Sequence, residues 1–166
     1  FPRRCDIVCG REAVSIPVVK HIVPMVGGIP LGSTVGGCRN FCGALEESLA
    51  SGHAVTIYPE AHIWPYCNFI RDYPSGSFMY PGRFDVPAVG FTVTYRRRMI
   101  FKSRPPLITV TVGKPVMPGE YVTRDELRDR IHGFMTDTVN SNGSYEYIKY
   151  RKKDSDNSAN IGGFTA

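Results

Sequence analysis

The sequence predicts an α/β domain in which a mostly parallel central sheet is flanked by helices. Short apolar segments that suit buried strands alternate with segments whose apolar residues recur every three to four positions, as in amphipathic helices. The chain has 166 residues, of which 42% are hydrophobic and 21% charged, a composition that excludes wholesale disorder. No stretch approaches the roughly 18–20 continuous apolar residues that cross a bilayer.

The first half of the chain is expected to contain three strands and two helices. In chain order these are a strand at 6–9, a helix at 15–23, a strand at 29–31, a helix at 39–50 and a strand at 54–58. The second helix carries Phe41, Leu45 and Leu49 at four-residue spacing, which forms one apolar face, and Gly52 follows as a natural stop. The third strand is halted by Pro59.

The second half is expected to hold two strands and a long helix after a turn-rich segment. In order these are turns over 65–82, strands at 86–95 and 107–112, and a helix from 123 onward. Thr123 and Glu126 have the spacing of a capping box. We expect residues 1–150 to form the domain and residues 151–166, which are polar, to form a disordered tail.

The charge of the chain is mildly basic, with 20 Lys and Arg against 15 Asp and Glu. This balance suits phosphate esters, lipid headgroups or nucleic acid as partners. The basic residues within 95–104 are Arg96, Arg97, Arg98, Lys102 and Arg104. This segment is either a solvated strand end or, with Met99, Ile100 and Phe101, an apolar tip drawn to an anionic membrane. No pattern of a known nucleic-acid-binding motif accompanies it, so we expect no nucleic-acid partner.

The five cysteines indicate reduced thiols, because their number is odd and no secretory leader is recognised. We therefore expect a cytosolic compartment. The pairs Cys5/Cys9 and Cys38/Cys42 fall within the loose range of zinc-ligand spacing. Small apolar thiols that pack in a strand and a helix explain the same spacing, so we expect no metal.

Four short motifs occur in an order that is familiar from one family. Residues 57–60 (Ile-Tyr-Pro-Glu) are similar to a Phe-Pro-Glu-Gly block, and residues 27–31 (Gly-Gly-Ile-Pro-Leu) to the block before it. Residues 86–89 (Val-Pro-Ala-Val) and 113–116 (Gly-Lys-Pro-Val) are similar to the two that follow. Together they resemble the glycerolipid acyltransferases, the family of 1-acyl-glycerol-3-phosphate acyltransferase, over roughly residues 5–150. The resemblance implies a glycerol-3-phosphate acyltransferase-like fold.

The resemblance also implies a catalytic histidine with an aspartate five positions later, in a block that precedes the first strand. The histidine is the general base for the acceptor hydroxyl, and the aspartate orients it. We expect this block upstream of Phe1, so that the chain is N-terminally truncated, contains no catalytic residue and is inactive by itself. His132 and Asp137 have the right spacing, but on a helix five residues turn about 500°, which separates the side chains by about 140°. We therefore reject this pair.

The resemblance implies a set of substrate-binding residues around the strand that ends at Pro59. They are Tyr58, Pro59, Glu60, His62, Gly28, Pro30, Ser33, Arg71 and Arg83. Glu60 is the leading candidate, in direct contact with substrate or as a structural anchor for nearby amides. His62 is either a headgroup contact or an ordinary loop histidine. The family's phosphate-binding arginines fall at Ser33 and Ile63, and we expect Arg71 and Arg83 to replace them unless each is a solvated surface charge.

These implications define an expected function. The intact protein would transfer an acyl group from a thioester of coenzyme A or acyl carrier protein to a glycerol-phosphate or lysophospholipid-type acceptor. The thioester is a co-substrate, and no other cofactor is expected. The alternative is a catalytically dead, lipid-binding pseudo-acyltransferase, and a His-x-x-x-x-Asp block upstream of Phe1 would discriminate the two. We expect the chain to lie peripherally at the cytoplasmic face of an anionic membrane.

Overall fold

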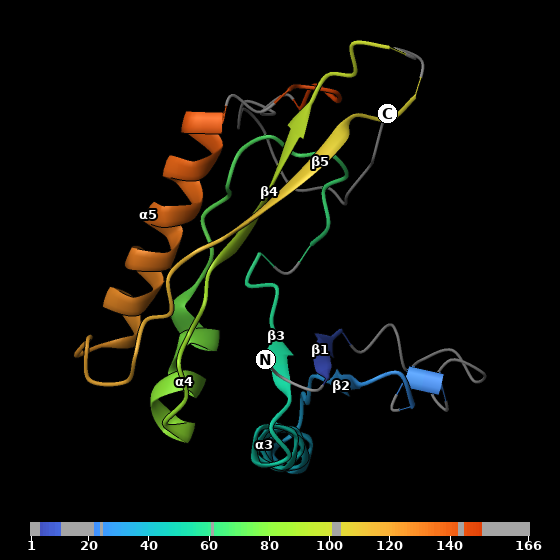
Figure 1. The fold of residues 1–166 in the computed structure, drawn as a ribbon. Coiled ribbons are helices and arrows are strands. Elements are labelled where there is room, and N and C mark those ends of the chain that lie inside the picture. The colour runs from blue at the N-terminus through green and yellow to red at the C-terminus, as the bar shows by residue number, and fades with distance from the viewer. Residues whose placement is uncertain are drawn as a thin grey trace, which may run out of the picture.

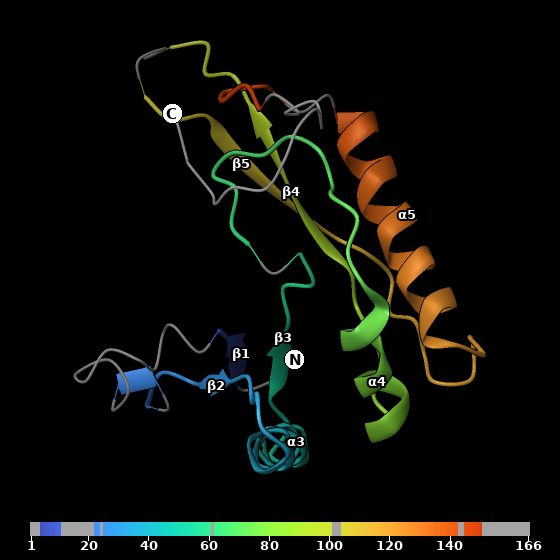
Figure 2. The ribbon, with the colours of Figure 1, turned by 180° about the vertical axis from the view of Figure 1, so that it is seen from behind.

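The computed structural model describes residues 4–10, 22–23, 25–60, 62–100, 104–142 and 145–150, and the statements below concern these residues. The expected helix at 15–23, apart from its last two residues, and the expected tail at 151–166 lie outside them. Figures 1 and 2 show two groups of elements, one built around α3 and the other around α5.

The first group is a three-stranded parallel sheet covered by one helix. The strands are β1 (Cys5–Cys9), β2 (Gly28–Pro30) and β3 (Ala54–Thr56), in the order β2-β1-β3. The helix α3 (Val35–Ala50) packs on β2 and β3. Its Phe41 and Leu45 form a buried cluster with Ile29 of β2. The apolar face expected from the four-residue spacing is therefore the face that covers the sheet.

The second group is an antiparallel strand pair with a long helix along it (Figure 1). The strands are β4 (Phe91–Arg96) and β5 (Leu107–Val112), and the helix is α5 (Arg124–Asn142). A 3-10 turn, η1 (Ser75–Phe78), and a short helix, α4 (Met79–Phe84), precede the strands. The buried core of this group joins Phe78 of η1 to Leu127 and Ile131 of α5, together with Tyr73 before η1 and Ala88 before β4.

The parallel three-stranded sheet and its helix confirm the predicted α/β class, whereas the last two strands run antiparallel. The connection 97–106 between β4 and β5 is too short for a parallel crossover, which needs about a dozen residues or more. The strand expected at 86–95 begins only at Phe91, and Ala88 makes an isolated bridge to Val116. The strand expected at 54–58 ends at Thr56.

The helix α4 was not expected, because Pro81 and Gly82 indicated a turn. Pro81 is the third residue of α4, and N–H groups in the first turn of a helix have no intrahelical acceptor. The proline therefore costs the helix no hydrogen bond. Asp85 closes α4 in the left-handed conformation, at φ 50°.

Side-chain caps begin both long helices. Thr34 accepts a hydrogen bond from the amide of Gly37 at 3.0 Å, so α3 begins four residues before the predicted position. Thr123 accepts from the amide of Glu126 at 3.2 Å, as the capping box predicts. The Glu126 carboxylate accepts in return from the amide of Val122 rather than that of Thr123.

The structure contains, in its described ranges, no helix that is both long and apolar enough to cross a membrane.

Candidate functional site

The parallel sheet brings two of the predicted motifs, residues 27–31 and 57–60, to one edge. Because β1, β2 and β3 are parallel, their carboxyl ends lie together, and ligands of α/β proteins gather at this edge. β2 ends there at Pro30, with Ser33 three residues further on, and β3 leads into Tyr58, Pro59 and Glu60. Gly28 starts β2 and is paired with Ile7. The sheet therefore gathers most of the predicted substrate-binding residues.

An ion pair between Glu60 and Arg71 organises the loop after β3. The Nε atom of Arg71 donates to Oε2 of Glu60 at 2.9 Å, and the two side chains are 17% and 25% exposed. A terminal nitrogen of the same guanidinium donates to the carbonyls of Glu60, at 3.3 Å, and His62. The guanidinium also lies over the ring of Trp64, 4.6 Å from its centroid. Arg71 thus contacts Glu60, His62 and Trp64 in the loop that follows β3.

The C-terminal segment packs on this same loop. Tyr150 stacks on Trp64 with ring centroids 4.9 Å apart and planes inclined by 24°. Its hydroxyl donates to the carbonyl of Pro65, and the ring of Phe69 meets both aromatic rings edge-on. We name Trp64, Phe69 and Tyr150 the aromatic clasp. The clasp joins the residues that follow α5 to the loop that carries Glu60.

Burial keeps the Tyr73 phenol and the Cys67 thiol, which lie near Glu60, in their neutral forms. Burial, with a smaller contribution from the Glu60 charge, raises the pKa of Tyr73 to about 12. Burial also raises the pKa of the Cys67 thiol, and Glu60 adds to this shift while Arg71 opposes it. The phenol and the thiol are therefore uncharged at neutral pH, and the site's charge resides in the Glu60–Arg71 pair.

The remaining predicted residues have other surroundings. Tyr58 is 58% exposed and meets Phe91 of β4 edge-on at 6.2 Å. Arg83 lies on α4, where its guanidinium is 3.7 Å from the sulfur of Cys42 on α3 and 5.6 Å from the Phe84 ring centroid. Arg71 and Arg83 were the candidates to replace the two arginines of the family unless each is a surface charge. Arg71 is bonded to Glu60, whereas the contacts of Arg83 are with α3 and its own helix.

The described histidines do not form the rejected pair. Nε2 of His132 lies 3.7 Å from the carboxylate of Asp72, and Asp137 is exposed on α5. His62 is exposed, and its carbonyl is held by Arg71. Among the described residues, its ring makes no hydrogen bond or ion pair that would decide between the two predicted roles.

A buried polar cluster at the opposite end of the sheet was missed by the sequence analysis. Asp6 of β1 accepts from Ser48 at 2.7 Å, lies 3.0 Å from Nδ1 of His53 and pairs with Arg4 at 2.9 Å. The Ser48 hydrogen bond, then His53 and Arg4, lower the pKa of Asp6 against the opposing effect of burial. The cluster ties β1 to the end of α3 and the start of β3. No sequence spacing signals it, because Ser48 and His53 are 42 and 47 residues apart from Asp6.

The cysteines are free, and the two pairs with zinc-like spacing lie on β1 and α3. Among the described residues there is no group of three or more His, Cys, Asp and Glu side chains that could hold a metal ion.

The fold has a counterpart among solved structures. No family model matches the sequence, and no curated protein matches it. The chain is similar to the crystal structure of the 1-acyl-sn-glycerophosphate (LPA) acyltransferase PlsC from Thermotoga maritima, with a TM-score of 0.60 and 18% identity. The similarity covers 87% of this chain and 58% of that chain. The present chain thus spans little more than half of the matched structure, and the two share the acyltransferase fold that the four motifs predict.

Proposed function

We propose that this chain is part of an O-acyltransferase that acts on a glycerol-phosphate or lysophospholipid-type acceptor. The observation that carries the proposal is the fold shared with the Thermotoga maritima LPA acyltransferase. In the reaction the acceptor oxygen bonds to the acyl carbon as the carbon–sulfur bond of the thioester breaks. The hydroxyl proton passes to a base and then to the thiolate that leaves. Coenzyme A and acyl carrier protein both fit the donor role, and no further cofactor takes part.

In this proposal the acceptor lies at the carboxyl edge of the parallel sheet. Pro30 and Ser33 approach from β2, and Tyr58, Pro59 and Glu60 from β3, with His62 on the exposed side of the loop. Arg71 is a positioning residue, because its guanidinium is bonded to Glu60 and to the loop carbonyls. Its role is to present the loop rather than to bind phosphate.

We propose that the general base comes from a segment outside this chain. The sequence contains no His-x-x-x-x-Asp block before β1. Among the described residues β3 pairs only with β1, so its other edge is open to a further strand. We propose that such a strand, from a segment preceding β1, brings the histidine and aspartate beside Glu60.

Thiol release from an acyl thioester tests this function. The 166-residue chain and a longer product that begins upstream of Phe1 are each incubated with acyl-coenzyme A and either lysophosphatidate or glycerol 3-phosphate. We expect release only from the longer product, and its loss when the upstream histidine is replaced by alanine. A longer product that contains the His-x-x-x-x-Asp block but acts on neither acceptor contradicts the proposal. A longer product that lacks the block and binds the lipid without turnover indicates the pseudo-acyltransferase instead.

The connection between β4 and β5 supports a place at an anionic membrane surface. Arg97 is exposed, and Met99 and Ile100 are 92% and 73% exposed beside it. Exposed apolar side chains next to basic ones suit the interface of a membrane with anionic lipids. Phe101 and Lys102, which belong to the same predicted tip, lie outside the described residues. The proposed location is the cytoplasmic face, with peripheral attachment.

A further inference from the structure

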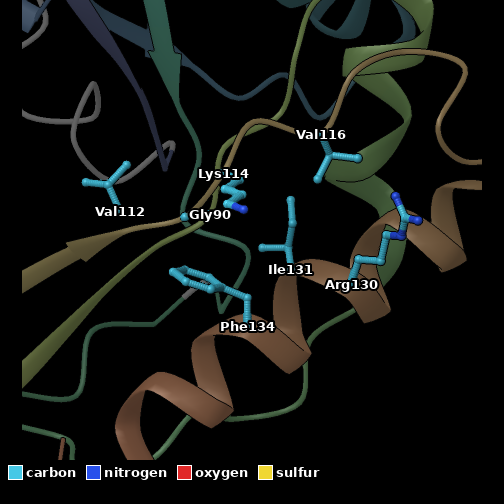
Figure 3. A pocket seen from close by; sticks show the side chains of 8 residues that line it. Gly90, Val112, Lys114, Val116, Arg130, Ile131 and Phe134 are labelled. Carbon is cyan, nitrogen blue, oxygen red and sulfur yellow. The ribbon is translucent and has the colours of Figure 1, made fainter. Parts of the chain in front are cut away.

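A pocket of about 390 Å³ opens where α5 crosses the ends of β4 and β5 (Figure 3). Its walls are mainly apolar side chains from two sides, with Val116 after β5 and Ile131 and Phe134 on α5. The backbones of Gly90 and Gly113 form another part of the wall, joined by a hydrogen bond of 2.8 Å. Pockets of this size and character are typical of small-molecule sites.

Gly90 and Gly113 allow α5 to pack closely on the ends of β4 and β5. Because they have no side chains, they also leave the pocket open. A Cβ atom at Gly113 would lie 3.0 Å from the ring of Phe134 and 3.2 Å from the carbonyl oxygen of Gly90. A Cβ atom at Gly90 would lie 3.0 Å from a methyl group of Ile131. Any larger residue at these positions would therefore crowd the pocket or push the helix away.

Two cations line the same pocket. Lys114 follows β5 and Arg130 lies on α5, so the charges come from different elements, and both residues are exposed (Figure 3). Neither side chain has a hydrogen bond or ion pair within the described part of the chain. Arg128, two residues earlier on the same helix, is paired with Asp129 at 2.7 Å. Lys114 and Arg130 thus leave two positive charges available beside an apolar wall.

From these features we infer that the pocket binds a single-chain amphiphile with an anionic head group. The hydrocarbon chain lies in the pocket, and the head group lies between Lys114 and Arg130. Carboxylate and phosphate heads share the required charge, and both accept hydrogen bonds from the two cations. The inference is independent of the proposed acyl transfer, because it rests on none of the residues around Glu60.

Calorimetric titration of the chain with dodecyl phosphate and with laurate, each below its micelle concentration, tests the inference. We expect at least one of them to bind and to shift the amide resonances of Gly90 and Gly113 in nitrogen-15 spectra. The amphiphile that binds more tightly identifies the head group. Lys114→Gln and Arg130→Gln should each weaken binding about tenfold, since each removes a hydrogen bond to a charged group. The matched surface variants Lys149→Gln and Arg39→Gln should bind as the parent chain does.

Probes that carry only the hydrocarbon chain or only the charge distinguish this site from a plain apolar site and a plain anion site. Dodecanol, which has the chain without the charge, and inorganic phosphate, which has the charge without the chain, should each bind at least tenfold more weakly than the amphiphile. Equal binding of inorganic phosphate would indicate a plain anion site, and equal binding of dodecanol a plain apolar one. Either result overturns the inference, and so does an affinity that Lys114→Gln and Arg130→Gln leave unchanged. Because both substitutions are at exposed positions, thermal melting should show that they fold normally.

Discussion

Nε of Arg71 lies 2.9 Å from the carboxylate of Glu60, although eleven residues of turn-rich chain separate them. The same guanidinium also donates to the backbone carbonyls of Glu60 and His62. The Glu60 carboxylate is thus engaged in a contact that shapes the loop after β3. This geometry agrees with the proposal that the base comes from outside the chain described here.

Replacing Arg71 by lysine tests how much the loop depends on the guanidinium. Lysine keeps the charge but loses the planar group that reaches Glu60, the loop carbonyls and the Trp64 ring together. We expect Arg71→Lys to lower the free energy of unfolding by about 1.5–3 kcal/mol, the range for hydrogen bonds to charged groups. The measurement is urea unfolding followed by circular dichroism. Arg83→Lys is the control, and an equal loss in both variants would contradict the special role of Arg71.

Tyr150→Ala tests the aromatic clasp. The substitution removes the ring that stacks on Trp64 and the hydroxyl bonded to Pro65. Because Trp64 is the single tryptophan of the chain, its fluorescence reports directly on the loop after β3. We expect emission to shift to longer wavelength and quenching by iodide to increase, as the indole becomes more exposed to water. Tyr150→Phe keeps the ring and should retain the emission of the parent chain; unchanged emission in Tyr150→Ala would show that the clasp does not shield Trp64.

Asp6→Asn tests the buried polar cluster and its dependence on pH. The pKa of Asp6 lies below its usual 3.8 in the folded chain, so the carboxylate adds stability above that pH. The contribution is lost as the pH falls through the lower pKa of the folded state. We expect Asp6→Asn to lower the free energy of unfolding by about 1.5–3 kcal/mol at pH 7, with the difference shrinking below pH 3.8.

Urea unfolding of both chains at a series of pH values provides the measurement. Asp137→Asn, at an exposed position on α5, serves as the matched control and should have little effect. A difference for Asp6→Asn that persists unchanged at low pH would mean that the carboxylate charge is not what stabilises the cluster.

Arg97→Gln tests the proposed membrane contact. A basic residue near an anionic surface contributes about 1 kcal/mol, so binding to vesicles that contain phosphatidylserine should fall about fivefold. Met99→Asp should weaken it further, because it replaces an exposed apolar side chain by a charge of the wrong sign. The measurement is co-sedimentation with vesicles, with phosphatidylcholine vesicles for comparison. Arg39→Gln, on α3, should bind as the parent chain does, and equal binding to both vesicle types would exclude an electrostatic contact.

Local patterns in the sequence predicted the elements whose signals are short-range. The four-residue spacing of Phe41, Leu45 and Leu49 predicted α3, and the cap at Thr123 predicted the start of α5. The strand at 107–112 was predicted with its bounds, since its apolar and threonine residues alternate. The short helix α4 was missed, because a proline in the first turn has the same local signature as a turn.

The sequence alone determined the α/β class, the long helices, and the motif that places Glu60 after the strand β3. Only the tertiary structure decided which side chains meet: Arg71 with Glu60, Tyr150 with Trp64, and His53 with Asp6. It also decided that β4 and β5 run antiparallel and that two glycines leave a pocket beneath α5. The physical reason is the sequence separation over which each kind of interaction acts. Helix periodicity and capping act over a few residues, whereas ion pairs, ring stacking and cavities depend on contacts between residues that the fold alone brings together.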